Sequence, residues 1–412
     1  MSEAARAIVA LIVIAAVAGV IVRLRRTPEA AWAVGGAALL VLTGLLPIPD
    51  AAAGIAKSLD VCLFLTGMML LAETARREGL FDAVAGFAVN RAGGSPAALF
   101  ALTYAAGVVV TVFLSNDATA VVLTPARRAK TRPLPHLFAC AMVANAASFV
   151  LPISNPANLV LYASRPPPLG AWLAAFALPS ALAIAATYAA LRWAERGALA
   201  GAGERAVPQP PLTRGAWAAI AGLALAVAVM LAVSAMDRPL GLPTAAVGAG
   251  VAALPLLARR ASPLPLLRAI HWAVLPLVAG FFVMVEALDR IGGVGLIGWT
   301  LEHAGSTGTG GAAVAGGATA MAVNLVNNLP AGLLASQAAT LAHAPRKLLD
   351  ALLIGVDLGP NLSVTGSLAT ILWLGAIRRE GENVTAWRFL KTGLVVMPPA
   401  LALALAARLL LP

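Results

Sequence analysis

Long apolar segments separated by short polar breaks run along the whole chain. Residues 7–22, 215–233 and 391–411 are apolar stretches of the kind that cross a bilayer as helices. A basic cluster at residues 23–26 follows the first stretch instead of preceding it, so this segment is predicted to be a span and not a cleaved signal. The pattern predicts an all-α polytopic membrane protein with about ten transmembrane spans.

The polar breaks occur twice with the same spacing. Asn116 and Asn145 are separated by 29 residues, and so are Asn328 and Asp357. An offset of 212 residues relates the two pairs, which indicates an internal duplication. Duplicated broken helices in a membrane protein point to a binding site at the interface of the repeats.

The boundaries of the duplication follow from these breaks. The first repeat is predicted over residues 1–195, a cytoplasmic linker over 196–214 and the second repeat over 215–412. Each repeat is predicted to contain one re-entrant helical hairpin and one broken helix. These lie at about 96–128 and 134–164 in the first repeat, and at about 311–343 and 347–377 in the second.

The charged residues indicate the topology. The chain has 29 Lys and Arg against 18 Asp and Glu, a net charge of +11. With Arg23 on the inside, the alternation of spans places most basic residues in cytoplasmic segments, as the positive-inside rule requires. Both termini then lie outside, and the two halves, each with an odd number of spans, insert in opposite directions. Topology explains the positive charge, so no nucleic-acid partner is predicted.

Each hairpin tip is predicted to lie inside the protein. The second arm of each hairpin is too short to cross a hydrocarbon core of about 30 Å, and backbone at membrane depth needs polar partners. A half-helix that begins after Asp117 or Pro330 would aim its N–H groups at a bound solute. Amides and hydroxyls in the tips and breaks suit a small hydrogen-bonding solute. The predicted substrate-binding residues are Ser115, Asn116, Asn145, Ser154, Asn155, Asn158, Asn327, Asn328, Thr365, Gly366 and Ser367.

Four acidic residues lie in apolar surroundings, where a carboxylate is costly and therefore a functional candidate. Asp117 and Asp357 sit at the breaks and are predicted to carry protons. Glu73 and Glu286 lie near the ends of their spans, where we expect structural ion pairs. The arginines near these two glutamates are Arg76, Arg77 and Arg290.

Longer motifs match a known family. Ser115-Asn116-Asp117 is followed by Leu123-Thr124-Pro125, residues 154–159 read Ser-Asn-Pro-Ala-Asn-Leu, and residues 357–374 run from Asp-Leu-Gly-Pro to Trp-Leu. At these positions, and in the final span at 387–398, the chain resembles the arsenite and antimonite efflux permeases of the ion transporter superfamily. The resemblance implies inverted repeats around a central site and export of trivalent metalloid hydroxides in exchange for protons. It also implies a homodimer in the cytoplasmic (inner) membrane of a bacterium.

The candidate residues are compatible with this substrate. Arsenous acid is an uncharged trihydroxy species at neutral pH that both donates and accepts hydrogen bonds, as amides and hydroxyls do. The two cysteines, Cys62 and Cys140, give no metal or disulfide pattern, so recognition through hydroxyl groups is favoured over sulfur coordination and no cofactor is predicted. One position departs from the family: many arsenite permeases carry an aspartate where this chain has Asn145, and an amide cannot titrate.

An elevator mechanism is expected, in which the hairpins and broken helices move as a unit past a scaffold formed by the other spans. Glycines such as Gly35-Gly36 and Gly292-Gly293 would permit close helix contact in the implied dimer. The short cytoplasmic loops contain no obvious docking motif for a soluble ATPase.

Other functions stay open at this stage. A sodium- or proton-coupled anion carrier or a sodium–proton antiporter of the same superfamily is the nearest alternative, although Asp117 and Leu329 replace the small hydroxyl residues that cage sodium in such carriers. A passive channel would also have broken helices. An intramembrane aspartyl protease is disfavoured because neither aspartate has a Gly-x-Gly-Asp pattern, and the chain lacks zinc-protease and phosphate-loop signatures.

Overall fold

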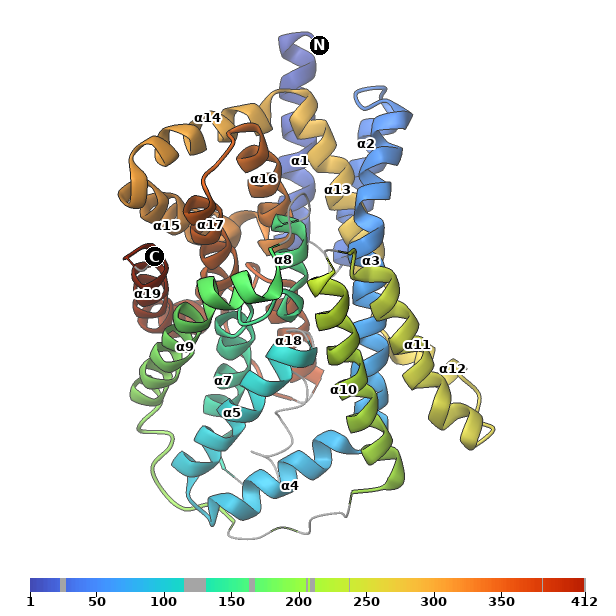
Figure 1. Ribbon diagram of the computed structural model, residues 1–412, viewed down its shortest axis with the longest axis vertical. Helices are drawn as coiled ribbons and strands as arrows, with labels where there is room; N and C mark the ends of the chain where they lie inside the picture. The colour runs from blue at the N-terminus through green and yellow to red at the C-terminus, as the bar shows by residue number, and fades with distance from the viewer. Residues whose placement is uncertain are drawn as a thin grey trace.

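Every element in the described part of the chain is a helix (Figure 1). The computed structural model describes residues 1–22, 27–114, 131–162, 167–204, 207, 212–236, 238–379 and 381–410. The first half contains α1 (Glu3–Val22), α2 (Glu29–Leu42), α3 (Ile48–Arg77), α4 (Leu80–Ala92), α5 (Pro96–Leu114), α7 (Pro133–Ala146), η3 (Pro152–Ser154), α8 (Pro156–Leu161) and α9 (Leu169–Ala194). The second half contains α10 (Arg214–Ala235), α11 (Gly241–Ala258), α12 (Leu264–Ala269), α13 (Val274–Arg290), α14 (Gly293–Ser306), α15 (Gly308–Val326), α16 (Asn328–Leu341), α17 (Arg346–Leu358), η4 (Gly359–Leu362), α18 (Leu368–Arg379) and α19 (Ala386–Leu410). The predicted all-α fold is confirmed.

The helices of the two halves correspond in order, and some counterparts also correspond in length. Helices α5 and α15 each have 19 residues and begin 212 positions apart. Helix α4 lies across the lower end of the molecule in Figure 1, and its counterpart α14 lies across the upper end. Counterparts at opposite ends are what an inverted repeat requires.

One element differs between the halves. Helix α3 is a continuous helix of 30 residues, whereas the corresponding second-half segment forms two helices, α12 and α13, separated at residues 270–273. Ile270 has an extended backbone that ends α12. The indole of Trp272 donates a hydrogen bond of 2.7 Å to the carbonyl oxygen of Leu267, which satisfies an acceptor at the open end of α12. Apolar patterning alone did not predict this break.

Length and composition make eight described helices capable of crossing a membrane: α1, α3, α5, α9, α10, α11, α15 and α19. Two of them, α5 and α15, are the first arms of the predicted hairpins. Helix α16, the second arm of the second hairpin, has 14 residues and is therefore only about 21 Å long. The multi-pass character is supported, and the number of full crossings stays a prediction.

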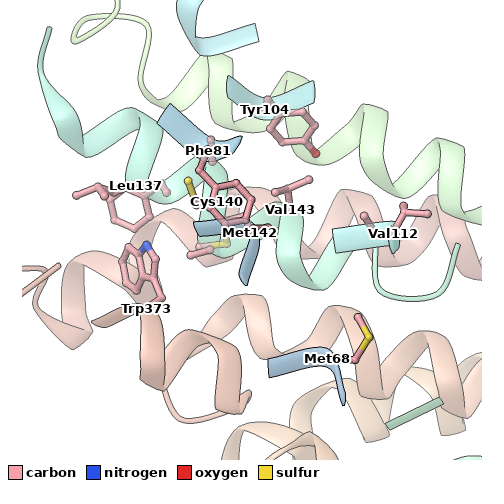
Figure 2. Close-up of a cluster of buried hydrophobic side chains, with 14 of the residues drawn as sticks. Met68, Phe81, Tyr104, Val112, Leu137, Cys140, Met142, Val143 and Trp373 are labelled. Atoms are coloured by element: carbon pink, nitrogen blue, oxygen red, sulfur yellow. The ribbon is translucent and has the colours of Figure 1, made fainter. Parts of the chain in front are cut away.

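The broken helices form the interior of the protein. All residues of α7 from Pro135 to Ala146 are buried, and Figure 2 shows its side chains Leu137, Cys140, Met142 and Val143 among side chains from other helices. In the second half, α17 packs so closely on α15 that a Cβ built on Gly355 would lie 2.3 Å from the carbonyl oxygen of Gly316. The continuously buried parts of the broken helices are residues 135–146 of α7 and 350–358 of α17, which the rest of the protein encloses.

Glycines serve helix packing within the chain. A Cβ on Gly67 of α3 would lie 2.2 Å from the carbonyl oxygen of Thr244 on α11. A Cβ on Gly36, one of the glycines expected to permit dimer contact, would lie 2.6 Å from Ala16 of α1 and 3.2 Å from Met284 of α13. Gly292 has φ +86° at the turn before α14, a conformation that favours glycine. A Cβ on Gly293 would lie 3.1 Å from the carbonyl oxygen of Leu288, so three of the four glycines expected to permit a dimer contact have roles within the chain.

Candidate functional site at the crossing of the broken helices

The two broken helices are joined by side-chain hydrogen bonds at their breaks. Asn145, in the last turn of α7, donates through Nδ2 to Oδ1 of Asn361 in η4 at 2.8 Å. Asn155, just before α8, donates through Nδ2 to Oδ1 of Asp357 at 2.7 Å. The exposed fraction of each of these four side chains is 1% or less. The folded chain thus brings three predicted site residues, Asn145, Asn155 and Asp357, to one buried crossing between the repeats.

The breaks are stabilised by helix capping. Asn155 Oδ1 accepts a hydrogen bond of 3.0 Å from the N–H of Ala157 at the start of α8, and Ser367 Oγ accepts one of 3.2 Å from the N–H of Ala369 in α18. Such N-caps satisfy amide groups that a helix start leaves open. Asn155 therefore has two roles: its oxygen holds α8 and its nitrogen contacts Asp357.

The tip of the second hairpin packs on the second break. The backbone N–H of Asn328 donates to the carbonyl oxygen of Gly366 at 2.8 Å, and Asn327 Nδ2 donates to the carbonyl oxygen of Thr365 at 3.0 Å. Asn327 has φ +77° and caps α16, so this half-helix begins at Asn328 and not, as predicted, after Pro330. Four predicted site residues are in contact at this tip.

Asn324, which sequence reasoning missed, connects the tip to the crossing. Its Nδ2 donates to the carbonyl oxygen of Gly359 at 3.1 Å, and its Oδ1 accepts from Ser363 Oγ at 2.7 Å. The Oγ1 of Thr365 donates a hydrogen bond of 3.3 Å to the backbone oxygen of Asn324. A third asparagine one turn before the Asn327-Asn328 pair was the available signal.

Four buried oxygen atoms of predicted site residues have no hydrogen-bond partner among the described residues: Asn145 Oδ1, Asn158 Oδ1, Asn328 Oδ1 and Asp357 Oδ2. Buried polar atoms are normally paired, so unpaired ones call for an explanation such as a ligand, an ion or water. The three amide oxygens are acceptors, and Asp357 Oδ2 is an acceptor when the carboxyl group is ionised. They suit a solute that donates hydrogen bonds, or a cation.

The electrostatics of the crossing are unusual for a carboxylate. Asp357 is fully buried, and among the described residues no Lys, Arg or His forms a salt bridge with it. An unpaired buried charge is expensive, and such a group is favoured in its neutral form unless a cation binds.

Other predicted residues have local roles or lie outside the described part. Ser154 Oγ donates to the carbonyl oxygen of Val112 at 3.0 Å and accepts from the N–H of Leu151 at 3.2 Å, so its hydroxyl holds the first break in shape. Ser115, Asn116 and Asp117, including one of the two predicted proton carriers, lie outside the described residues.

The glutamates predicted to form ion pairs do so, with one change of partner. Glu73 pairs with Arg76 and Arg77, each at 2.7 Å. Glu286 pairs with Lys57 of α3 at 2.6 Å. The expected partner Arg290 instead bonds Asp50 at 2.5 Å. The sequence could not show this exchange because Lys57 and Glu286 are 229 residues apart.

A buried charged cluster was missed altogether. Asp350 of α17 is fully buried and accepts hydrogen bonds from Arg346 Nε at 2.8 Å, from Arg408 Nε at 2.7 Å and from the hydroxyl of Tyr162. These contacts join the end of α8, the start of α17 and the end of α19. Because the carboxylate is fully paired, the cluster is a structural tie and differs from Asp357.

Metal ligands are not gathered at this site. No group of three or more His, Cys, Asp or Glu side chains lies together within the part of the chain that the structure describes.

Multiple apolar helices and a buried polar crossing between repeats define a multi-pass membrane transporter. The chain belongs to the citrate transporter family, because the model of that family matches residues 5–355.

Known proteins support the same class. The chain is 25% identical over 404 residues to an arsenical pump membrane protein of Escherichia coli, covering 90% of this chain and 91% of that protein. It is 26% identical over 369 residues to an uncharacterized transporter of Mycobacterium bovis, covering 84% of both chains. Its fold is similar to the crystal structure of the YdaH transporter of Alcanivorax borkumensis, with a TM-score of 0.55, 15% identity, and coverage of 87% and 86%.

Proposed function

We propose that this protein is a secondary active transporter that exports arsenite and antimonite, as uncharged trivalent hydroxides, in exchange for protons. The observation that carries the proposal is the pair of buried oxygens at the crossing, Asn145 Oδ1 and Asp357 Oδ2, that have no hydrogen-bond partner among the described residues. Arsenous acid presents three hydroxyl donors, which match such acceptors. The relatives named arsenical pump membrane protein support the same substrate.

The proton enters the proposal through Asp357. No Lys, Arg or His among the described residues pairs with this carboxylate. It would therefore alternate between a protonated form and an ionised form that a bound cation or a hydrogen-bond donating solute stabilises. Protonation from outside and release of the proton to the cytoplasm would drive solute in the opposite direction. A change in the protonation of Asp357 would alter its hydrogen bond with Asn155, which also caps α8.

We further propose an elevator motion in a homodimer, located in the cytoplasmic membrane of a bacterium. The second hairpin and the second broken helix are tied together by Asn324, Asn327 and Asn328. These bonds favour movement of the two elements as one body. The bacterial origin of the relatives supports the location.

A second candidate is an anion carrier, since the matched family is described as a citrate transporter. A carboxylate substrate is an acceptor only and needs donors or cations around it. The unpaired oxygens at the crossing repel such a group. An anion would therefore require a sodium ion or a proton to bind at these oxygens with it.

Uptake into everted membrane vesicles energised by respiration separates the candidates. Proton-driven export predicts accumulation of arsenite in sodium-free buffer that a protonophore abolishes. Accumulation of citrate or another dicarboxylate, especially with a sodium requirement, would replace the proposal with the anion carrier. Arsenite entry that only equilibrates across the membrane would indicate a channel.

A further inference from the structure

A cavity beside the crossing is lined by residues of both halves. It has a volume of about 830 Å³ and reaches from Asn158 of α8 and Tyr162 to Gln337 of α16. The connection between α10 and α11 forms another wall through Arg238 and Leu240. This volume falls in the range of small-molecule pockets, and it exceeds what a single metalloid hydroxide fills.

One face of α16 lines this cavity. The lining positions Leu333, Ser336, Gln337, Thr340 and Leu341 follow the spacing of three and four residues that places side chains on one helix face. The Oε1 of Gln337 is buried and has no partner among the described residues. Gln337 is thus a carboxamide residue of the cavity wall, next to the hydroxyl residues Ser336 and Thr340, and its unpaired Oε1 is covered in this structure.

Asn158 supplies a second acceptor with a fixed orientation. Its Nδ2 donates to the carbonyl oxygens of Ser148 at 2.8 Å and Leu151 at 3.2 Å. Both amide hydrogens are thus used, and exchanging nitrogen and oxygen would place an acceptor against two other acceptors. Oδ1 has no hydrogen-bond partner among the described residues, and Asn158 is only 1% exposed.

The charged residues that line the cavity balance each other. They are two cations, Lys57 and Arg238, and two anions, Asp60 and Asp289. Lys57 is in addition paired with Glu286 at 2.6 Å. A lining without positive surplus gives no attraction for a multiply charged anion, whereas its acceptors attract an uncharged solute rich in hydroxyl donors.

In the predicted topology, the cavity lies on the outer side of the membrane. Helix α11 separates the connection at Arg238–Leu240 from the basic pair Arg259 and Arg260. The positive-inside rule places that pair in the cytoplasm. The α10–α11 wall of the cavity then lies at the opposite, outer end of α11.

From these observations we infer that the cavity is a second, outward binding station for the exported neutral hydroxide, with Gln337 and Asn158 as its hydrogen-bonding contacts. This inference rests on the proposed function and extends it. A solute leaving the crossing enters a space that accepts its hydroxyl donors and carries no net charge. Gln337 is a contact that the sequence did not suggest.

The test compares the two sides of the membrane. Gln337→Met keeps the length of the side chain and removes the carboxamide. We expect it to raise the half-saturation concentration of external arsenite, measured as entry into right-side-out vesicles, by about threefold to tenfold, the effect of one hydrogen bond. Half-saturation from the cytoplasmic side, measured in everted vesicles, stays unchanged. Equal shifts on both sides, or no shift, would overturn the inference.

Thr319→Val is the matched control, because this α15 hydroxyl bonds its own helix at Ala315 and does not line the cavity. It should change neither value. Labelling tests the cavity without arsenite: in a Cys62→Ala background, Gln337→Cys should react with a membrane-impermeant maleimide in right-side-out vesicles while buried Cys140 does not. Labelling only in everted vesicles, or none, refutes the outward station. A wild-type protein that moves no arsenite but shows outward labelling would refute the proposed substrate and leave the cavity in place.

Discussion

Replacing Asp357 by asparagine separates proton coupling from folding. Asp357 is fully buried, its Oδ1 accepts a 2.7 Å bond from Asn155, and its Oδ2 has no partner among the described residues. Asn has nearly the same shape and keeps an oxygen for Asn155. Its amide cannot take up or release a proton, so Asp357→Asn is expected to abolish accumulation driven by a proton gradient.

The expected change in stability is small and has a defined sign. A hydrogen bond to a charged group contributes about 1.5–3 kcal/mol and a neutral one about 0.5–1.5 kcal/mol, so neutralising Asp357 weakens the bond from Asn155 by about 1–1.5 kcal/mol. Removing an unpaired buried carboxylate recovers several kcal/mol of desolvation whenever the group is ionised. The unfolding temperature of Asp357→Asn should therefore equal or exceed that of the wild type.

Two measurements on the same preparation test this reasoning. Arsenite accumulation in everted vesicles should fall to the level seen with a protonophore, while thermal unfolding in detergent shows no loss of stability. Wild-type accumulation by Asp357→Asn would refute the role in coupling. A large drop in unfolding temperature would show instead that Asp357 is a structural residue and that its unpaired oxygen has no functional meaning.

Three further substitutions probe the packing around the site. Asp350→Ala leaves Arg408 buried without its carboxylate and should lower the free energy of unfolding by about 3–5 kcal/mol; thermal unfolding measures this, and an unchanged midpoint would contradict the structural role. Gly355→Val places a Cβ 2.3 Å from a carbonyl oxygen of α15 and should abolish folded yield on size-exclusion chromatography, whereas Gly317→Ala, with nothing within 4 Å, should behave as wild type. Asn155→Ala removes a helix cap and the described side-chain hydrogen bond to Asp357, so it should cost about 1–3 kcal/mol of stability, and full stability with full transport would speak against the dual role of Asn155.

The sequence by itself determined the fold class and the candidate region. Apolar runs of membrane-spanning length can only be satisfied as helices in lipid, and the 29-residue spacing repeated at an offset of 212 located both broken elements. Asn327 ends α15 where the sequence placed the hairpin turn, whereas α7 ends at Ala146, six residues before Pro152. Local chemistry decides these features, so they can be read along the chain.

Only the tertiary structure decided which groups meet. Asn155 contacts Asp357, which lies 202 residues further along the chain. Glu286 pairs with Lys57 and not with the nearby Arg290, and Asp350 pairs with Arg408 on another helix. Such pairings depend on how helices pack against one another, and many packings bury the same apolar faces equally well. The candidate polar residues can therefore be identified from the sequence, whereas their hydrogen-bond partners depend on how the two repeats pack.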